Sequence, residues 1–209
     1  MAGPVYSAGL ELRAAGDGTR RLAGSFPYLS LAVIDSGGNG RRPKKEQFAE
    51  GAFSWGLQQP ASERDVHLLI GHSFDKPLAS RKAGTLNFTD TKSALNFEAI
   101  LTPEIMRTTW GADFLAAFQA GLVGGISPGF RVAPKEVVPL PEEITDEDES
   151  LGEALIRTIF AAILFELSLV TRPAYHDTNV DLRAWGSSSI GGTQSRLPKI
   201  GDTLRRWRL

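Results

Sequence analysis

Short apolar runs separated by turn-forming segments dominate the first hundred residues. The runs are "YLSLAVID" (28–35), "VHLLIGH" (66–72), "AGTLNFTD" (83–90) and "SALNFEAIL" (93–101). In the last two runs the large apolar residues are spaced two apart, as Leu86 and Phe88 show, and this period is typical of strands. The short polar segment between the two runs predicts a β-hairpin.

The period changes after residue 101. In "TPEIMRTTWGADFLAAFQAGL" (102–122) the apolar residues recur near helical spacing. Thr102 and Pro103 suit the N-cap and first position of a helix, and Gly121 suits its end. A strand, "VGGISPGFRVAP" (123–134), is expected directly afterwards, and its glycines indicate a bend or a close approach of the backbone.

The second half of the chain begins with an acidic stretch. Six of the eight residues from Glu142 to Glu149 are acidic, and prolines precede them, so residues 134–153 are expected to form a solvated loop or insertion. The most apolar part of the chain, "ALIRTIFAAILFELSLV", follows. Its β-branched residues favour two strands, at about 154–161 and 163–170.

These patterns predict one main domain over residues 22–184. Residues 1–21 are expected to be a flexible N-terminal segment. Residues 185–209 are expected to be a flexible tail, rich in Gly and Ser, with the basic terminus "LRRWRL".

Composition narrows the class of protein. Hydrophobic residues make up 42% and charged residues 22% of the chain, as in soluble globular proteins. The net charge of −1 gives no indication of a nucleic-acid partner or an anionic membrane, and no apolar run is long enough to span a bilayer. No secretory signal is visible at the N-terminus. There is no cysteine and no metal-ligand spacing among the three histidines, so neither a metal nor another cofactor is expected.

Ser127 and His72 are the natural candidates for catalysis. A serine hydroxyl needs an adjacent base, usually histidine, and the histidine needs an acceptor on its other nitrogen. Either residue alone is more typical of a structural role. Glu166, inside an apolar strand, either faces solvent or is the acceptor for His72, because an unpaired buried carboxylate is costly. His67 lies five residues before His72, is expected on the opposite face, and is interpreted as structural.

Taken together, the ordered segments resemble the prohead proteases of tailed bacteriophages, which are related in fold to the herpesvirus assemblins. The similar segments are "EQFAEGAFSWGL", "VHLLIGHSFDKPLA", "AGTLNF", "ALNFEAIL", "GADFLAAFQAGLVGGISPGFRV" and "LFELSLVTRPAYHDTNV". They cover roughly residues 22–183. The chain departs from the family pattern in "GHSFDKPLAS", where an asparagine before the histidine and a glycine after "PL" are more usual. These changes flank the histidine without removing it.

The resemblance implies a serine protease with His72 as general base, Ser127 as nucleophile and Glu166 as the orienting acid. Assemblin-like enzymes use a second histidine instead of the acid, which leaves His176 as an alternative third member. Pro128 has no N–H, so the residue after the nucleophile cannot donate to the oxyanion. The oxyanion is therefore expected to be bound by an N–H of the "TRPAY" loop, with Arg172 or Arg131 assisting.

The resemblance also implies a mainly β, α+β fold: an assemblin-like β-barrel flanked by helices, with the helix before Ser127 beside the catalytic strand. The implied substrates are the major capsid protein and the scaffold, with self-cleavage as well, inside the procapsid in the host bacterial cytoplasm. Homo-oligomerisation is left open. Two alternatives are a non-enzymatic structural barrel protein of the virion and a serine hydrolase of small esters.

Overall fold

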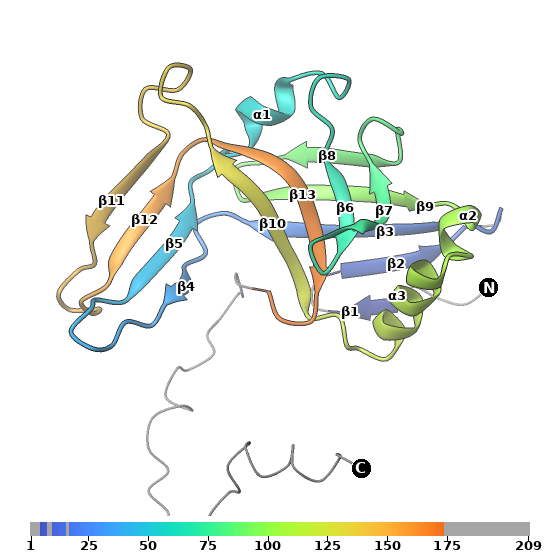
Figure 1. Ribbon diagram of the computed structural model, residues 1–209, viewed down its shortest axis with the longest axis horizontal. Coiled ribbons are helices and arrows are strands. Elements are labelled where there is room, and N and C mark those ends of the chain that lie inside the picture. Colours follow the sequence, from blue (N-terminus) through green and yellow to red (C-terminus); the bar gives the residue numbers. More distant parts are fainter. Residues whose placement is uncertain (1–4, 8–9, 16, 174–209) are drawn as a thin grey trace, which may run out of the picture. The chain divides into compact units, whose positions relative to one another are not determined.

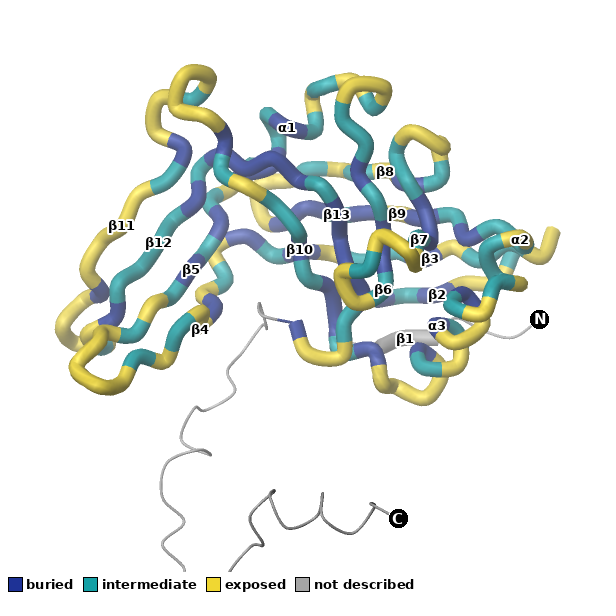
Figure 2. The backbone as a smooth tube through the Cα atoms, in the orientation of Figure 1, coloured by how far each residue is buried: buried dark blue, intermediate teal, exposed yellow. Residues whose placement is uncertain are grey.

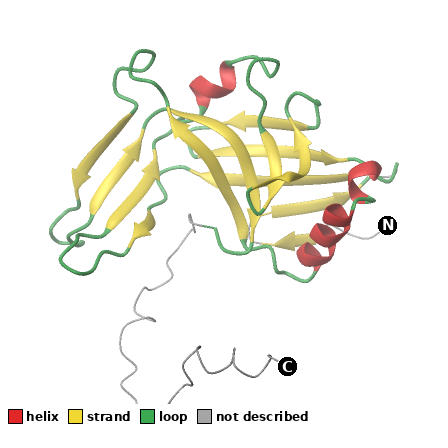
Figure 3. Cartoon of the chain, viewed as in Figure 1, coloured by secondary structure: helices red, strands yellow, loops and turns green. Residues whose placement is uncertain are grey.

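The computed structural model describes residues 5–7, 10–15 and 17–173, all within one compact unit, Met1–Asp177. A second unit, Thr178–Leu209, lies outside the described residues, as do His176 and the predicted tail. The described residues are 47% strand and 12% helix, which confirms the mainly β, α+β class (Figure 3).

Thirteen strands and three helices make up the described part (Figure 1). The strands are β1 (Val5–Ser7), β2 (Leu10–Ala14), β3 (Arg20–Pro27), β4 (Ala32–Asp35), β5 (Lys44–Phe48), β6 (His67–Ile70), β7 (Ser73–Ser80), β8 (Leu86–Asp90), β9 (Ala94–Leu101), β10 (Gly125–Val132), β11 (Glu142–Asp146), β12 (Leu155–Ile159) and β13 (Ala162–Val170). The helices are α1 (Ser54–Gln58), α2 (Pro103–Met106) and α3 (Thr109–Gln119).

The strands form three sheets. A five-stranded sheet has the order β1-β2-β3-β9-β8. The β13 sheet has the order β10-β13-β6-β7, and the β12 sheet has the order β11-β12-β5-β4. Within the described residues none of the three closes into a barrel, so the expected assemblin-like barrel is not confirmed.

One apolar core joins these sheets. Phe26 and Phe97 from the five-stranded sheet share a buried cluster with Leu68 and Leu167 from the β13 sheet and with Phe48 from the β12 sheet. The buried stretches of these strands stand out in Figure 2. Because one face of the β13 sheet rests on this core, its other face is free to carry polar groups.

The helix expected at residues 102–121 is present in two pieces. Thr102 and Thr108 cap α2 and α3, since each side chain accepts a hydrogen bond from a backbone N–H three residues on. Gly121 ends the segment with a φ of 70°. The chain then enters β10, so this helical segment leads directly to Ser127. None of the described helices is long and apolar enough to cross a membrane.

Other predicted elements are confirmed. The hairpin is β8 with β9, paired antiparallel, and the two strands predicted in the most apolar stretch are β12 and β13. The first predicted strand is shorter than expected. Leu29 has a φ of 58° and donates its N–H to the carbonyl of Phe48, so the strand starts only at Ala32.

The N-terminal segment corrects an expectation. Residues 1–21 were expected to be flexible, but β1 and β2 extend the five-stranded sheet by pairing in sequence with β3. Leu10 and Leu12 are buried in the core. Their alternation with a polar residue is a strand signal that the expectation of a flexible segment overlooked.

The acidic stretch also differs from what the sequence predicted. The expected loop at 134–153 contains the edge strand β11, which pairs antiparallel with β12. Basic residues compensate its charge: Arg157 donates to Glu142 over 2.6 Å, and Arg42 donates to Asp146 over 2.7 Å. Lys45 donates to the buried carboxylate of Glu147, and this hydrogen bond holds the pKa of Glu147 below its ordinary value. Backbone pairing and charge compensation together therefore order a segment whose composition is typical of a solvated loop.

Candidate active site

A β-bulge in β13 turns Glu166 away from the core. In the pairing of β10 with β13, Gly129 is opposite Glu166 but Phe130 is opposite Leu164, so Phe165 is an extra residue. Leu164 belongs to the core cluster. Without the extra residue, Glu166 would share the face of Leu164. The bulge therefore places a carboxylate on the face that points away from the core.

Gly129 makes room for this carboxylate. A Cβ at Gly129 would lie 2.1 Å from Oε1 of Glu166, far inside contact distance. The Glu166 side chain thus lies against the backbone of β10, and only glycine is compatible with that position.

His72 approaches the carboxylate from the turn after β6. Its Nδ1 lies 2.7 Å from Oε1 of Glu166. The Glu166 side chain is 6% exposed, whereas that of His72 is 49% exposed. Because a carboxylate only accepts, Nδ1 carries a proton, and in the neutral form of the ring Nε2 has the lone pair. His72 has a φ of 61°, in the left-handed region, and its ring contacts Glu166 on β13 from that turn.

Ser168 adds a second contact to each of these residues. Its hydroxyl donates to Oε2 of Glu166 over 2.6 Å and accepts from the backbone N–H of His72 over 2.9 Å. Its side chain is completely buried, at 0% exposure. The sequence offered one signal for it: residues two apart in a strand share a face, so Ser168 must accompany Glu166.

Ser127 lies beside this group. It is directly opposite Ser168 in the antiparallel pairing, so the two side chains share a face. Ser127 is partly buried and lies on β10, an edge strand of the β13 sheet. Within the described residues its hydroxyl forms no hydrogen bond to His72. The structure thus brings His72 and Glu166 into contact and places Ser127 on the adjacent strand.

His67 does not lie on the far side of the sheet from the site. It pairs in register with Glu166 on the parallel strand β6, and so shares its face. Its ring packs edge-on against Phe74, with centroids 5.8 Å apart, and its Nε2 lies 3.5 Å from Asp65. Phe74 is 60% exposed and lies two residues after His72, so an apolar surface adjoins the site.

The two arginines expected at the oxyanion lie in different settings. The guanidinium of Arg131 lies over the ring of Phe165, 4.8 Å from its centroid. Arg172 is exposed in the turn after β13. That turn packs on the start of β10, because a Cβ at Gly124 would lie 2.0 Å from the carbonyl oxygen of Thr171.

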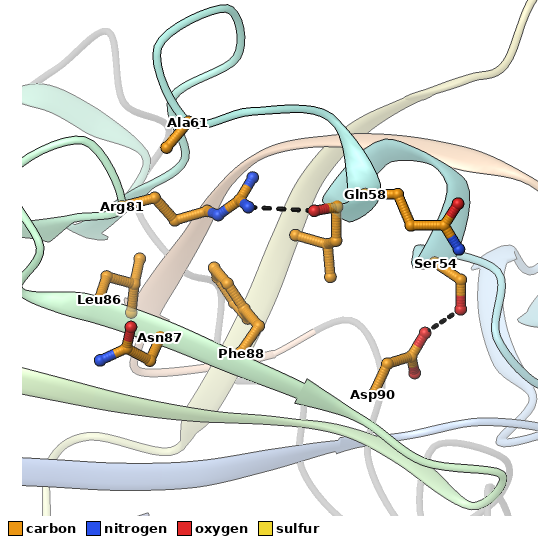
Figure 4. A pocket seen from close by; sticks show the side chains of 9 residues that line it. Ser54, Gln58, Ala61, Arg81, Leu86, Asn87, Phe88 and Asp90 are labelled. Carbon is orange, nitrogen blue, oxygen red and sulfur yellow. Dashed lines mark hydrogen bonds between the residues drawn. The ribbon is translucent and has the colours of Figure 1, made fainter.

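Two cavities lie away from these residues. One, of about 400 Å³, lies between α1 and β8, and its wall carries the guanidinium of Arg81 and the Ser54–Asp90 contact (Figure 4). The other, of about 410 Å³, lies on the β12 sheet around Arg157. Neither is lined by the catalytic candidates. In the part of the chain that is described, no group of three His, Cys, Asp or Glu residues could hold a metal ion.

The packing of Gly129 against Glu166 leads to a testable prediction. Gly129→Ala should lower the free energy of unfolding by about 1–3 kcal/mol, because the added methyl group overlaps the carboxylate. In a Glu166→Ala background the same change should cost much less, since the overlapping atoms are gone. Urea denaturation of the four proteins measures both costs. Equal costs in the two backgrounds would contradict the close approach.

Comparisons with known proteins agree with the resemblance drawn from the sequence. Neither the comparison with curated proteins nor that with solved structures gave a match. The model of one family, described as caudovirus prohead serine protease, matches residues 34–190, a range that includes His72, Ser127 and Glu166. The match spans most of the 209 residues. The chain therefore belongs to the caudovirus prohead serine protease family.

Proposed function

We propose that this chain is the serine endopeptidase that processes the capsid and scaffold proteins of a phage or prophage procapsid. Family membership makes it a serine peptidase in general terms and links it to capsid maturation. In the proposal, Ser127 is the nucleophile, His72 the general base and Glu166 the orienting acid. The observation that carries it is the 2.7 Å contact between Nδ1 of His72 and the buried Glu166, on the face that Ser127 shares.

The chemistry follows from these positions. Oγ of Ser127 attacks the scissile carbonyl carbon while Nε2 of His72 takes its proton. Glu166 stabilises the imidazolium that forms, since its carboxylate already accepts a hydrogen bond from Nδ1–H of His72. His72 then gives the proton to the leaving amine, and a water molecule, activated in the same way, hydrolyses the acyl-enzyme.

The surroundings of Ser127 favour a peptide as substrate. Ser127 lies on an edge strand, whose outer side pairs with no other described strand and so can offer backbone groups to an extended peptide. A hydrolase of small esters would instead place its catalytic residues in a compact pocket, and neither cavity described above includes them. A purely structural virion protein would have no need of a buried carboxylate that is hydrogen-bonded to a half-exposed histidine.

We further propose that the substrates are the major capsid protein, the scaffold and the protease itself, inside the procapsid in the bacterial cytoplasm. The Gly/Ser-rich segment 186–195, which lies outside the described residues, is a candidate linker or self-cleavage region.

Replacement of the nucleophile tests the activity itself. The wild type, co-expressed with the major capsid protein of the same phage or prophage, should remove an N-terminal segment of that protein, and Ser127→Ala should leave it intact. Intact-mass spectrometry of the capsid protein measures the difference. Identical masses with both proteins, while the wild type melts cooperatively, would refute the protease.

Glu166→Gln tests the orienting acid. The amide keeps the size of the side chain but removes the charge that stabilises the imidazolium, so turnover should fall by about 10²–10⁴. The rate of peptide cleavage and the melting temperature are measured on the same preparation. If the activity of a folded Glu166→Gln protein were near normal, the third role would pass to His176.

The oxyanion site has its own test. Pro128 has no N–H, and the turn at Thr171–Pro173 packs on the start of β10, so we propose a backbone donor from this turn with Arg172 assisting. Arg131, the other candidate, is directed at Phe165. A crystal structure with a tetrahedral adduct on Ser127 should show a donor from this turn within hydrogen-bond distance of the oxyanion. An oxyanion bound only by other groups would contradict the assignment.

A further inference from the structure

Ser168 is a completely buried polar residue to which the steps above assign no role. Its hydroxyl contacts both members of the His72–Glu166 pair: the backbone N–H of His72 and the side-chain carboxylate of Glu166. It lies opposite Ser127 in the pairing of β10 with β13. These three relations place its hydroxyl between the nucleophile's strand and the base.

The direction of each hydrogen bond is fixed. A hydroxyl has one proton, and the backbone N–H of His72 can only donate, so the oxygen of Ser168 accepts there, over 2.9 Å. Its own proton is then free for Oε2 of Glu166, over 2.6 Å. Oε1 accepts from Nδ1 of His72, so both oxygens of the carboxylate are occupied by different donors.

Two donors orient a carboxylate in a way that one cannot. The terminal torsion of a glutamate side chain is broad, so a single bond at Oε1 leaves the plane of the carboxylate free to turn. A second donor at Oε2 fixes that plane. The same hydroxyl also accepts a hydrogen bond from the backbone of His72. One buried oxygen atom therefore positions both the carboxylate and the residue that carries the imidazole.

The geometry points to Ser168 as a positioning residue for the catalytic pair, an inference that rests on the proposed function. A serine that merely satisfied its own hydrogen bonds could do so with the nearby backbone. Here its partners are the acid two residues before it and the base 96 residues away in sequence. Loss of the hydroxyl would leave Oε2 of Glu166 and the His72 N–H without their donor and acceptor, in a site closed to solvent on the Glu166 side.

The kinetic test compares Ser168→Ala with Leu167→Val. Ser168→Ala should lower kcat by about 10–100-fold with KM changed less than twofold, because the pair is misplaced while the substrate surface stays intact. Leu167 is the preceding residue on β13, but its side chain lies in the core cluster, so its truncation weakens the fold without touching Glu166. Leu167→Val should keep kcat. A kcat of Ser168→Ala within twofold of wild type, or a fall that Leu167→Val reproduces, would overturn the inference.

A spectroscopic test needs no activity. Proton NMR of the Ser127→Ala protein should show the Nδ1–H resonance of His72 far downfield, because this proton is hydrogen-bonded to a carboxylate. In this background, Glu166→Gln should remove the resonance. Ser168→Ala should shift the resonance upfield, or broaden it by faster exchange with water. Leu167→Val should leave the resonance in place. An unchanged resonance after Ser168→Ala, or no such resonance to begin with, would refute the positioning role. Failure of the wild type to cleave capsid protein, with this resonance present, would count against the proposed function alone.

Discussion

The site depends on a carboxylate buried beneath an edge strand. An ionised carboxyl group removed from water is strongly unfavourable unless charged or polar partners replace its hydration. Glu166 meets this condition with one donor for each oxygen, the ring of His72 and the hydroxyl of Ser168. The position of His72, the proposed general base, is therefore coupled to the burial of Glu166, because the hydrogen bond that offsets the cost of burying the carboxylate also orients the ring.

Two features of the backbone make the burial of Glu166 possible. The extra residue at Phe165 changes which face Glu166 occupies, and the missing side chain at Gly129 gives the carboxylate its space. Phe165 itself stays on the outer side, where it supports the guanidinium of Arg131. A strand of regular pleat would place Glu166 with Leu164 in the core. The local irregularity is thus a requirement of the site.

The sequence predicts the elements better than their arrangement. The hairpin β8–β9, the capped helical segment and the strands that carry Ser127 and Glu166 all have local signals, such as the period of two or Thr102 before Pro103. The contact of His72 with Glu166 was one of two possibilities left by the cost of a buried carboxylate. The sequence places Ser168 on the face of Glu166 but does not predict its bond to the backbone of His72, which depends on how β6 lies against β13. The need for Gly129 was not predicted, because it depends on the register of β10 against β13 and on a bulge. Register comes from pairing over long sequence distances, and no local pattern encodes it.

Strand pairing also explains why two segments, the acidic stretch and the N-terminal segment, contain strands that the sequence did not predict. A flexible segment was expected at the N-terminus and a solvated loop at the acidic stretch, but a strand needs only a partner strand and compensation of its charges. β2 finds its partner in β3, and β11 finds β12 together with Arg157.

His72 shows how the anchored and the exposed parts of the site meet. Its left-handed backbone costs about 1 kcal/mol relative to an extended one. Because half of its side chain is exposed, packing alone cannot hold the ring, and the bonds to Glu166 and Ser168 do so instead. Glu166 and His72 are thereby held by the interior strand β13, whereas Ser127 lies on the edge strand β10, where we propose that a peptide pairs. Catalytic hydrogen bonds commonly tighten only when substrate is bound. A bond between Ser127 and His72 that forms as a substrate strand pairs with β10 would confine attack to a peptide already held in register.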